Sequence, residues 1–343
     1  MRVLFLPQTG ELGPSSRYRV YQLLPLLREM GFDCVVSPAI DDGLYPQIYL
    51  GGRGSRRAAL RAIWRTRRAD LQRLGEFDAV FVQKGVFPGL YSGIERELAA
   101  RKPVVFDLDD AVWLPRQGGS QLLRTLHRES TVQAIVKRAA AVIAGNEFLA
   151  DYCRQFNENV AIVPSAIDLS RYPRTRNSTT IGWIGSRTTL PYLKPLGLVF
   201  GKLGVKPRVI ASGDPAQLGF PVDFCAWRLE TESEDLAQIG IGVAPLPDTP
   251  WERGKCGVKV LQYMACGIPV VASPVGIHNQ IIRHGVNGFL APEPAEWESY
   301  LSELIDGPEL RQKLGAAGRQ TVEEHYDLRH AAEKVGAVLR SLK

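Results

Sequence analysis

The sequence predicts an α/β protein with two Rossmann-like domains, each built on a parallel sheet. Short apolar segments alternate with helical segments along the chain, and this alternation is typical of parallel strands covered by helices on both faces. A length of 343 residues allows two such domains with separate cores. An apolar content of 45% and a charged content of 23% are ordinary for a soluble globular protein.

The first domain is predicted over residues 1–172. Its first helix is expected to begin at Ser15 or Ser16, since serine is a good N-cap residue, and to end at Gly31. Pro25 should kink this helix. The apolar segments predict strands at Val3–Leu6, Cys34–Val36, Ala79–Val82, Val104–Phe106, Ala141–Ala144 and Ala161–Val163.

A stretch rich in Pro, Arg, Asn, Ser and Thr indicates a linker at residues 173–179, and the second domain is predicted over 180–325. Its strands are expected at Thr180–Ile184, Arg208–Ala211, Val222–Cys225, Ile241–Leu246 and Val270–Ser273. Its helices are expected at Leu190–Leu203, Val258–Cys266, Ala295–Ile305 and Pro308–His325. Residues 326–343 are predicted to form a C-terminal helix.

Composition narrows the class of protein further. No apolar run approaches the ~20 residues that a membrane-spanning helix needs, and the N-terminal MRVLFLPQTG predicts a first strand and no signal peptide. Five cysteines without a C-x-x-C pair favour free thiols in a reducing cytosol. No His/Cys cluster has the spacing of metal ligands. We therefore expect a cytoplasmic protein that uses no metal or other cofactor.

Positive charge is concentrated in one stretch, residues 53–73. It holds eight arginines against a single acid, Asp70, and its apolar residues recur at near-helical spacing, which predicts a basic amphipathic helix. Such a helix can dock on anionic lipid headgroups at the inner face of the membrane, or on an anionic acceptor; the alternative is a solvated helix face. No nucleic-acid module or interleaved aromatic pattern accompanies the charge, which argues against a nucleic-acid partner.

A loop rich in Pro and Gly, Pro247–Gly257, leads into the predicted helix at Val258. Gly257 allows close approach of the backbone, and the free N–H groups of the first helical turn attract an anion. Lys255 and Lys259 add two positive charges to this helix start. The arrangement favours a diphosphate ligand.

This segment resembles the signature of a large family of retaining glycosyltransferases with the GT-B fold. The family pattern runs roughly E-G-F-G-x-x-x-x-E-A-M-A-x-G-x-P-V-V-A-S-x-x-G, an E-x7-E signature, and residues 285–290 extend the resemblance. Gly254 and Gln262 stand where the family has its two glutamates. The matching residues are Gly257, Met264, Ala265, Gly267, Pro269, Val270, Val271, Ala272, Ser273 and Gly276.

The resemblance implies two Rossmann-like domains that face one another across a cleft, with the C-terminal helix crossing back to the first domain. It also implies a metal-independent hexosyltransferase that moves a sugar from a nucleotide diphosphate donor to a glycan, lipid-linked or small-molecule acceptor with retention at the anomeric carbon. In the family the leaving phosphate takes the proton of the acceptor, so no side-chain nucleophile is needed.

Lys255 and Asp109 are the candidate catalytic residues. Lys255 lies at the predicted anion-binding helix start, where it can neutralise charge on a leaving diphosphate; the alternative is a solvated surface lysine. Asp107, Asp109 and Asp110 come at the end of a predicted strand, and carboxylates there indicate a site. The resemblance places Asp109 where the family often has a histidine that contacts the transferred sugar. Helix capping, or an ion pair with an arginine, is the alternative for Asp109.

Further residues are predicted to bind the donor. The resemblance gives Gln262 the place of the glutamate that holds the ribose hydroxyls, and an amide can both accept and donate; the alternative is helix packing. Gly254 cannot replace the other glutamate, whose family role is contact with the transferred sugar. The remaining candidates are Gly13, Arg17, Arg187, Trp227, Cys256, Gly257, Val258 and Lys259. A plain turn at Gly13, a surface position for Arg187, core packing of Trp227 and a structural partner for Lys259 stay open.

Two rival functions remain beside the transferase. One is a sugar-nucleotide epimerase of the same architecture. The other is a catalytically degenerate GT-B protein that binds a nucleotide or a glycan, and the absence of both signature glutamates favours it.

Overall fold

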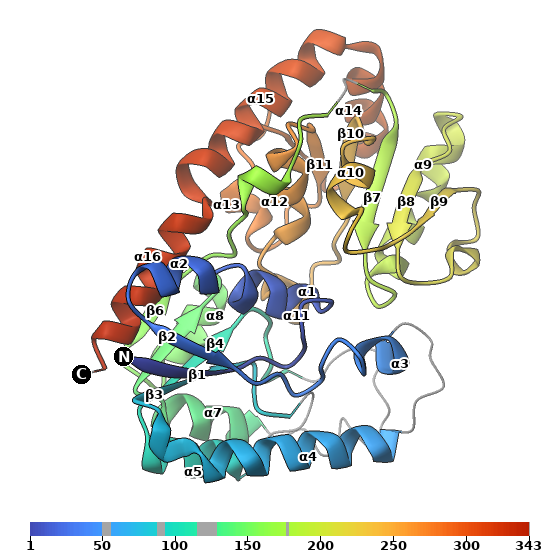
Figure 1. The fold of residues 1–343 in the computed structure, drawn as a ribbon. Helices are drawn as coiled ribbons and strands as arrows, with labels where there is room; N and C mark the ends of the chain where they lie inside the picture. Colours follow the sequence, from blue (N-terminus) through green and yellow to red (C-terminus); the bar gives the residue numbers. More distant parts are fainter. Residues whose placement is uncertain (50–55, 88–92, 115–128, 176–177, 343) are drawn as a thin grey trace. The chain divides into compact units, whose positions relative to one another are not determined.

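The computed structural model describes residues 1–49, 56–87, 93–114, 129–175 and 178–342, and the chain folds into two compact units (Figure 1). Unit 1 comprises residues 1–165, 253–256 and 328–343, and unit 2 comprises residues 166–252 and 257–327. Each unit holds a six-stranded sheet, and the strand pairs of both sheets are parallel. The predicted α/β class with two Rossmann-like sheets is confirmed.

The sheet of unit 1 has the strand order β2-β1-β3-β4-β5-β6. Its strands are β1 Arg2–Leu6, β2 Asp33–Val36, β3 Ala79–Gln83, β4 Val104–Leu108, β5 Ala141–Ala144 and β6 Val160–Ile162. All six predicted strands are present, and their ends differ from the predicted ones by two residues at most. Every residue of β3, β4 and β5 is buried, as expected for a parallel sheet with helices on both faces (Figure 1).

The first predicted helix is interrupted, so the prediction of one kinked helix is wrong. It consists of α1 Pro14–Ser16, a π-helical turn Arg17–Tyr21 and α2 Leu24–Glu29. The N-cap of α1 is Gly13, because Ser16 instead donates its hydroxyl to Gln83 Oε1 at 3.1 Å and accepts from Thr9. The helical segment ends near Gly31, as predicted, and this glycine has a positive φ of 87°.

The other helices of unit 1 flank the sheet. They are α3 Tyr45–Tyr49, α4 Arg56–Gln72, α5 Ile94–Arg101, α7 Glu129–Arg138, α8 Glu147–Arg154 and the C-terminal α16 Leu328–Arg340. Helix α16 packs on α2, where Arg340 lies over the Phe32 ring at 5.3 Å. Helix α8 begins at Asn146, whose side chain accepts from Leu149 N at 2.9 Å.

Helix α4 confirms the predicted amphipathic helix over the described part of residues 53–73; Arg53 lies outside the described residues. Ile63 packs in the core, whereas Leu60 and Trp64 are 44% and 55% exposed. The two residues lie one turn apart on the solvent face. The apolar residues of this helix are therefore divided between core and surface.

Arg67 does not belong to the exposed basic face. It is 1% exposed, donates to the carbonyl oxygens of Val86 at 2.9 Å and Ser37 at 2.8 Å, and pairs with Asp70 at 3.0 Å. This buried guanidinium fixes α4 to the loops that follow β2 and β3. The basic surface is consequently smaller than the count of arginines suggests.

The sheet of unit 2 has the order β12-β11-β10-β7-β8-β9. Its strands are β7 Ile181–Gly185, β8 Arg208–Ala211, β9 Asp223–Ala226, β10 Ile241–Ala244, β11 Val270–Ala272 and β12 Phe289–Leu290. The five predicted strands of this half are confirmed, and β12 was not predicted. Because unit 2 begins at Ala166, residues 166–175 belong to it; of the predicted linker, residues 176–177 lie outside the described part.

Helices of unit 2 include several that are too short for sequence periodicity to reveal. The helices are α9 Gly197–Lys202, which follows a 3-10 helix Leu190–Leu196, α10 Glu232–Leu236, α11 Pro250–Arg253, α12 Val258–Ala265, α13 His278–Ile281, α14 Pro294–Asp306 and α15 Pro308–His325. The predicted helices at α12, α14 and α15 are confirmed. The predicted Pro/Gly loop contains the unpredicted turn α11, and α10 and α13 were also missed.

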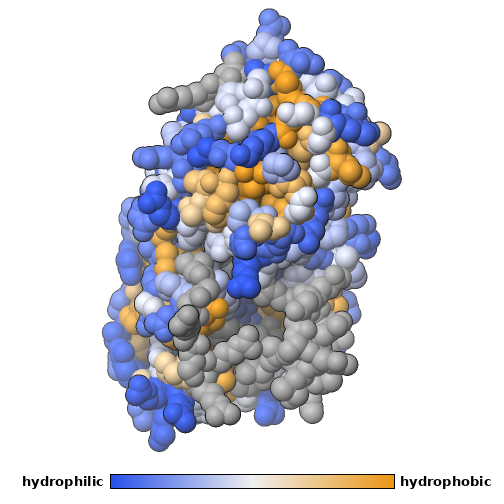
Figure 2. Space-filling view, turned by 90° about the vertical axis from the view of Figure 1, so that its right-hand side faces the viewer, coloured by the Kyte–Doolittle hydropathy of each residue, from blue (hydrophilic) through white to orange (hydrophobic). Residues whose placement is uncertain are grey.

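Apolar residues also gather on the surface of unit 2 (Figure 2). Leu198 on α9 is 82% exposed, and Phe224 on the edge strand β9 is 40% exposed. In the described part of the chain, no helix combines the length and the apolar character that crossing a membrane requires.

Candidate functional site

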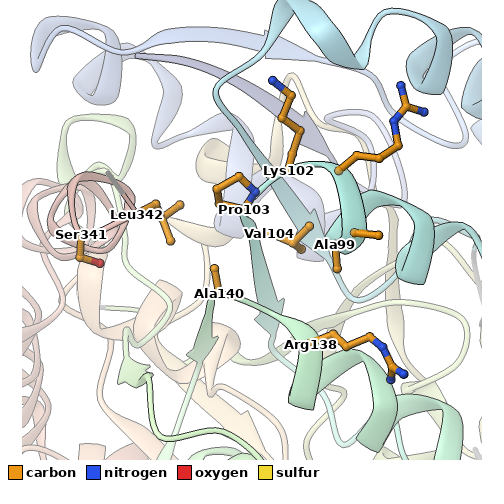
Figure 3. Close-up of a pocket in the computed structure, with 10 residues that line it drawn as sticks. Ala99, Lys102, Pro103, Val104, Arg138, Ala140, Ser341 and Leu342 are labelled. Carbon is orange, nitrogen blue, oxygen red and sulfur yellow. The ribbon is translucent and has the colours of Figure 1, made fainter.

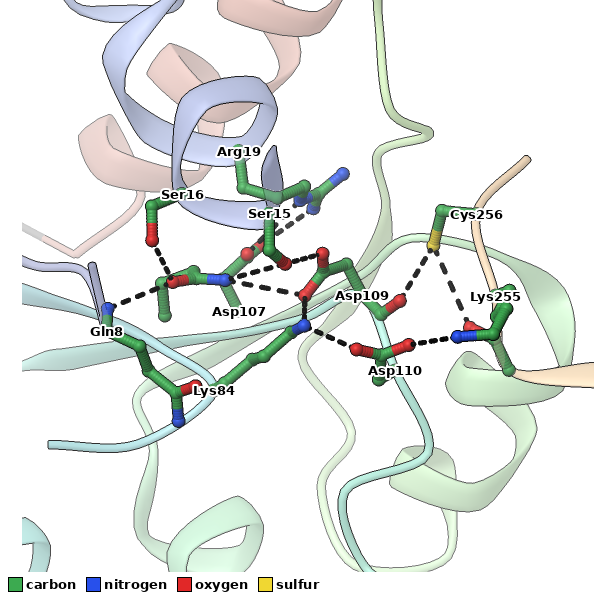
Figure 4. Close-up of polar contacts among 12 residues, drawn as sticks. Gln8, Ser15, Ser16, Arg19, Lys84, Asp107, Asp109, Asp110, Lys255 and Cys256 are labelled. Carbon is green, nitrogen blue, oxygen red and sulfur yellow. Dashed lines mark hydrogen bonds and ion pairs between the residues drawn. The ribbon is translucent and has the colours of Figure 1, made fainter. Parts of the chain in front are cut away.

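Polar side chains gather at the carboxyl edge of the unit 1 sheet (Figure 4). Gln83 ends β3, Lys84 follows it, and Asp109 and Asp110 follow β4. Strands β3 and β4 are neighbours in the sheet, with Gln83 in register with Asp107. Because the strands are parallel, their ends bring these residues together at one edge, where ligands of α/β proteins bind.

Asp109 is held by three donor side chains from two places in the chain. Its carboxylate accepts from Ser15 Oγ in a short hydrogen bond, from Gln83 Nε2 at 3.4 Å, and from Lys84 Nζ at 3.0 Å. The side chain is 11% exposed. The predicted arginine partner is absent from these contacts, because the ion pair is made by Lys84.

Lys84 was not among the predicted site residues. Its Nζ contacts Asp109 and makes a shorter ion pair with Asp110, and its backbone N donates to Asp107 O at 2.8 Å. Burial alone would lower the pKa of Lys84, but the two carboxylates outweigh it and raise the pKa above its ordinary value. A lysine that directly follows a fully buried strand is the signal that could have identified it.

A second ion pair lies beneath this cluster. Arg19, in the π-helical turn, pairs with Asp107 through two nitrogens, one of them Nε at 3.1 Å, and donates to Val163 O at 2.6 Å. Both side chains are almost fully buried. Burial lowers and Asp107 raises the pKa of Arg19, which ends above its ordinary value. These contacts of Arg19 fix the π-helical turn to β4 and to the residue that follows β6.

Lys255, the predicted diphosphate ligand, belongs to unit 1 although the sequence suggested the second domain. Its Nζ lies 3.6 Å from Asp110 Oδ1, and its side chain is 26% exposed. Asn146 Nδ2 donates to Lys255 O at 3.0 Å, which anchors the backbone at the start of α8. The structure thus brings both candidate catalytic residues, Lys255 and Asp109, to one polar cluster.

Cys256 and Gly254 pack closely against the residues that follow β4. The Cys256 thiol is buried, which raises its pKa, and it donates to Asp109 O at 3.4 Å. A Cβ at Gly254 would come within 2.8 Å of both N and Cβ of Ala111. Only glycine fits here, so a glutamate at this position would displace the backbone after β4.

Gln262, on α12 in unit 2, contacts a carboxylate that was not predicted as part of the site. Its Nε2 donates to Glu232 Oε1 at 3.1 Å and lies 3.4 Å from Tyr172 Oη. The indole of Trp227 donates to Glu232 Oε2 at 2.6 Å. The structure therefore joins the two predicted donor residues Gln262 and Trp227 through Glu232, which is 7% exposed.

Lys259 lies in the first turn of α12, close to the turn that follows β7. Its Nζ is 3.2 Å from Thr189 Oγ1 and 4.4 Å from the centre of the Trp183 ring. Arg187, in the same turn as Thr189, is exposed. Gly257, with a φ of 66°, is the N-cap that starts α12 at Val258, and a Cβ there would meet Ile281 at 2.6 Å.

The candidates Gly13 and Arg17 lie at the end of the loop that follows β1 and in the helical turn after it. A Cβ at Gly13 would come within 1.8 Å of Thr9 Oγ1, so this N-cap position requires glycine. Arg17 is 3% exposed, and its guanidinium donates to Glu11 O at 3.1 Å and lies over the Tyr18 ring. Both residues shape the loop from which Ser15 reaches Asp109.

A pocket of about 450 Å³ lies at the opposite edge of the unit 1 sheet (Figure 3). Pro103 and Ala140, which precede β4 and β5, line it together with Leu342. It opens at the amino ends of the strands and contains none of the candidate residues. Over the described residues, no group of three His, Cys, Asp or Glu side chains is arranged to hold a metal ion.

Sequence comparison relates part of the chain to glycosyltransferases. Residues 203–307 match the family described as "Glycosyl transferases group 1". A stretch of 91 residues is 35% identical to D-inositol 3-phosphate glycosyltransferase of Thermobispora bispora, and it covers 26% of this chain and 19% of that protein. The chain thus spans about a fifth of the length of this curated relative in the alignment.

Two solved structures resemble the chain over nearly its whole length. Anabaena HepE in complex with UDP and glucose has a TM-score of 0.74 at 17% identity, covering 99% of this chain and 100% of HepE. Sucrose-phosphate synthase from Thermosynechococcus elongatus has a TM-score of 0.76 at 16% identity, covering 100% of this chain and 99% of the synthase. The two parallel sheets and these likenesses show that the chain has the GT-B fold, with similarity to the group 1 glycosyltransferase family in residues 203–307.

Proposed function

We propose that this protein is a glycosyltransferase that moves a hexose from a nucleoside diphosphate donor to an acceptor, with retention at the anomeric carbon and without a metal ion. One observation carries the proposal. The residues that match the group 1 family, 203–307, contain both the glycine-started helix α12 and the polar contact between Gln262 and Glu232. An anion-binding helix start beside groups that can hold hydroxyls suits a nucleoside diphosphate.

Nucleotide binding is assigned to unit 2. Gly257 and Val258 open α12 with free backbone N–H groups, and Lys259 adds positive charge in its first turn. Gln262 is proposed to contact the ribose, with Glu232 orienting its amide. HepE has been solved in complex with UDP and glucose, which makes UDP the first nucleotide to test.

Sugar transfer is assigned to the polar cluster of unit 1. Lys255 is proposed to neutralise the leaving diphosphate, and Asp109 to contact the transferred sugar or the acceptor. The acceptor oxygen forms a bond to the anomeric carbon on the face from which the diphosphate leaves. Its proton passes to the leaving phosphate oxygen, so the products are a glycoside and a nucleoside diphosphate.

Helix α4 is proposed to bring the enzyme to an anionic surface at the cytoplasmic face of a membrane. Leu60 and Trp64 are exposed between the exposed arginines 61, 65 and 68. These positions form one stripe of the helix, in which an apolar side chain can enter the headgroup region while the guanidinium groups contact lipid phosphates. A lipid-linked acceptor would be presented at such a surface.

A ligand screen followed by a product assay tests the proposed function. Thermal unfolding is measured with UDP, GDP, dTDP and ADP, and a nucleotide at 100 times its Kd should stabilise the protein by about 2.7 kcal/mol. The matching nucleotide sugars are then incubated with candidate acceptors. Release of free nucleoside diphosphate together with a new glycoside supports the transferase.

The same assay separates the rival functions. Conversion of the nucleotide sugar into its epimer, with no free nucleoside diphosphate, would identify an epimerase. Binding of nucleotide without any turnover would identify a degenerate binding protein, which the replacement of both signature glutamates by Gly254 and Gln262 favours as the second candidate.

A further inference from the structure

We propose that Gln83 is a positioning residue that orients the Asp109 carboxylate, directly and through the Ser15 hydroxyl, for contact with a sugar hydroxyl. This inference rests on the proposed function, in which Asp109 contacts the transferred sugar or the acceptor. Its basis is a set of hydrogen bonds in unit 1 that runs from the loop after β1, across the end of β3, to Asp109 (Figure 4).

The orientation of the Gln83 amide follows from its contact with the backbone. Gln83 is fully buried, and one end of its amide lies 3.2 Å from the backbone N of Gln8. A backbone N–H can only donate, so the amide atom that faces it must be the oxygen. Ser16 Oγ donates to the same oxygen at 3.1 Å. The amide nitrogen of Gln83 therefore faces the other way, towards Ser15 and Asp109.

The amide nitrogen of Gln83 in turn sets the direction of the Ser15 hydroxyl. Nε2 donates to Ser15 Oγ at 3.2 Å and lies 3.4 Å from Asp109 Oδ1. A serine hydroxyl has a single proton, and because its oxygen accepts from Gln83, that proton points away from the amide. Ser15 Oγ donates it to Asp109 Oδ2 in a short hydrogen bond. Gln83 and Ser15 together thus contact both oxygens of one carboxylate.

This arrangement determines what Asp109 can bind. Lys84 Nζ lies 3.0 Å from Oδ1, so the carboxylate has three side-chain donors, and these do not exhaust its roughly four lone-pair sites. A carboxylate that only accepts suits a sugar hydroxyl, which donates. Because its donors already fix the plane of the carboxylate, little reorganisation is needed when the hydroxyl arrives. Losing Gln83 or Ser15 should therefore lower kcat and leave nucleotide binding unchanged.

The test measures kcat for sugar transfer and Kd for the nucleoside diphosphate. The ligand for calorimetry is whichever of UDP, GDP, dTDP and ADP stabilises the wild type, and the donor is a hexose conjugate of it that the wild type transfers. Gln83→Met and Ser15→Ala should each lower kcat about tenfold, equivalent to about 1.4 kcal/mol, at unchanged Kd. Because both act on one carboxylate, the double variant should lose about tenfold and not a hundredfold. Ser15→Thr keeps the hydroxyl and should recover kcat relative to Ser15→Ala.

Asn157 provides a matched control for a purely structural effect. It lies near the amino ends of β5 and β6, away from the polar cluster, and its amide is used in the same way as that of Gln83. Its Oδ1 accepts from Asn159 N at 2.8 Å, and its Nδ2 donates to Ala139 O at 2.8 Å. Asn157→Ala should lower the free energy of unfolding and leave kcat unchanged. If Gln83 were merely structural, Gln83→Met would behave in the same way.

The outcomes separate this inference from the proposed function. Asp109→Asn should lower kcat at least as much as Gln83→Met; wild-type kcat in Asp109→Asn would overturn the proposed role of Asp109 and this inference with it. If Asp109→Asn lowers kcat and the Gln83 and Ser15 variants do not, the inference alone is wrong. Losses that multiply in the double variant, or a parallel loss of nucleotide affinity, would also overturn it alone.

A second variant keeps the test decisive if Gln83→Met does not fold. Gln83→Glu has the same shape and can still accept from Gln8 N, but its carboxylate cannot donate to Ser15. It should show the same loss of kcat at unchanged Kd, and wild-type kcat in this variant would overturn the inference.

Discussion

Among single residues, the contact between Gln262 and Glu232 favours an amide over a carboxylate at position 262. Gln262 is 4% exposed and donates to the Glu232 carboxylate at 3.1 Å. A glutamate at position 262 would place two carboxylates at hydrogen-bond distance inside the protein, where like charges repel strongly.

A glutamate at position 262 should therefore destabilise the protein. We expect Gln262→Glu to lower the free energy of unfolding by about 1–3 kcal/mol at pH 7, because a buried hydrogen bond is replaced by repulsion. The exchange Gln262→Glu with Glu232→Gln should recover most of the loss. Urea unfolding of both variants measures this; a single variant as stable as the wild type would show that the two side chains do not interact.

Gly254 gives a second residue-scale prediction. A Cβ there would lie 2.8 Å from the Ala111 backbone N, so Gly254→Ala should destabilise unit 1 by about 1–3 kcal/mol through overpacking. Gly201, in α9 with nothing within 4 Å of an added Cβ, is the control, and Gly201→Ala should be neutral or stabilising. Thermal unfolding of the two variants makes the comparison, and equal melting temperatures would contradict the proposed close fit.

Asp109 and Lys255 could be predicted as candidates because strand-end carboxylates and a lysine among glycines are visible as sequence patterns. Lys84 and Glu232 were not predicted, because their contacts are with partners distant in the chain, Asp110 for Lys84 and Gln262 for Glu232. The position of Lys84 after a buried strand is visible in the sequence, but its pairing with Asp110 is not.

At the scale of elements, strands were predictable and the first helix was not. A buried parallel strand is a short apolar run, and all eleven predicted strands occur in the structure. Residues 15–31 have helical composition, but Ser16, Arg17 and Arg19 are drawn into tertiary contacts that interrupt the helix. Tertiary contacts override local preference in this segment.

Helix α13 should confer a pH dependence on stability. Its first residue, His278, is buried with Nδ1 3.0 Å from Ser273 O, and burial lowers its pKa from 6.5 to about 4, although the Ser273 carbonyl raises it. The unfolded chain binds a proton near pH 6.5 and the folded chain does not, so stability is full above pH 6.5 and falls as the pH drops towards 4.

From pH 7 to pH 5 the wild type should lose about 2 kcal/mol more than His278→Gln, in which the amide can still donate to Ser273 O. Urea unfolding at the two pH values measures the difference. Identical losses in the two proteins would contradict a neutral, buried His278.

The proposed binding of α4 to an anionic membrane surface can be tested by sedimentation with vesicles. Wild type should bind phosphatidylserine-rich vesicles at low salt and detach towards physiological salt, because each basic residue near the surface contributes about 1 kcal/mol within a Debye length. Replacing arginines 61, 65 and 68 by serine should abolish binding. The control replaces three exposed cations of unit 2, Lys206, Arg283 and Lys313, and should bind normally. A wild type that stays in the supernatant at low salt would contradict the docking surface.

For the molecule as a whole, the family match is distributed unevenly over the two units. The family match, residues 203–307, falls in unit 2 except for residues 253–256. Asp109 and Lys84 of unit 1 lie outside the matched residues, whereas Lys255 lies inside them.

The assignment of residues 253–256 to unit 1 was not predictable. The segment lies between two elements of unit 2 in the chain, and its place depends on Asn146 and on the fit of Gly254 against Ala111. Its consequence is that a residue from the second half of the sequence completes the polar cluster of the first sheet.

Calorimetry of the Lys255→Ala variant tests most directly whether Lys255 binds the donor diphosphate. The ligand is the nucleoside diphosphate that stabilises the wild type. A lost hydrogen bond to a charged group is worth about 1.5–3 kcal/mol, so a folded Lys255→Ala variant should bind the diphosphate roughly ten- to hundredfold more weakly and bind the nucleoside equally well. Wild-type affinity for the diphosphate in the folded variant would contradict the assignment.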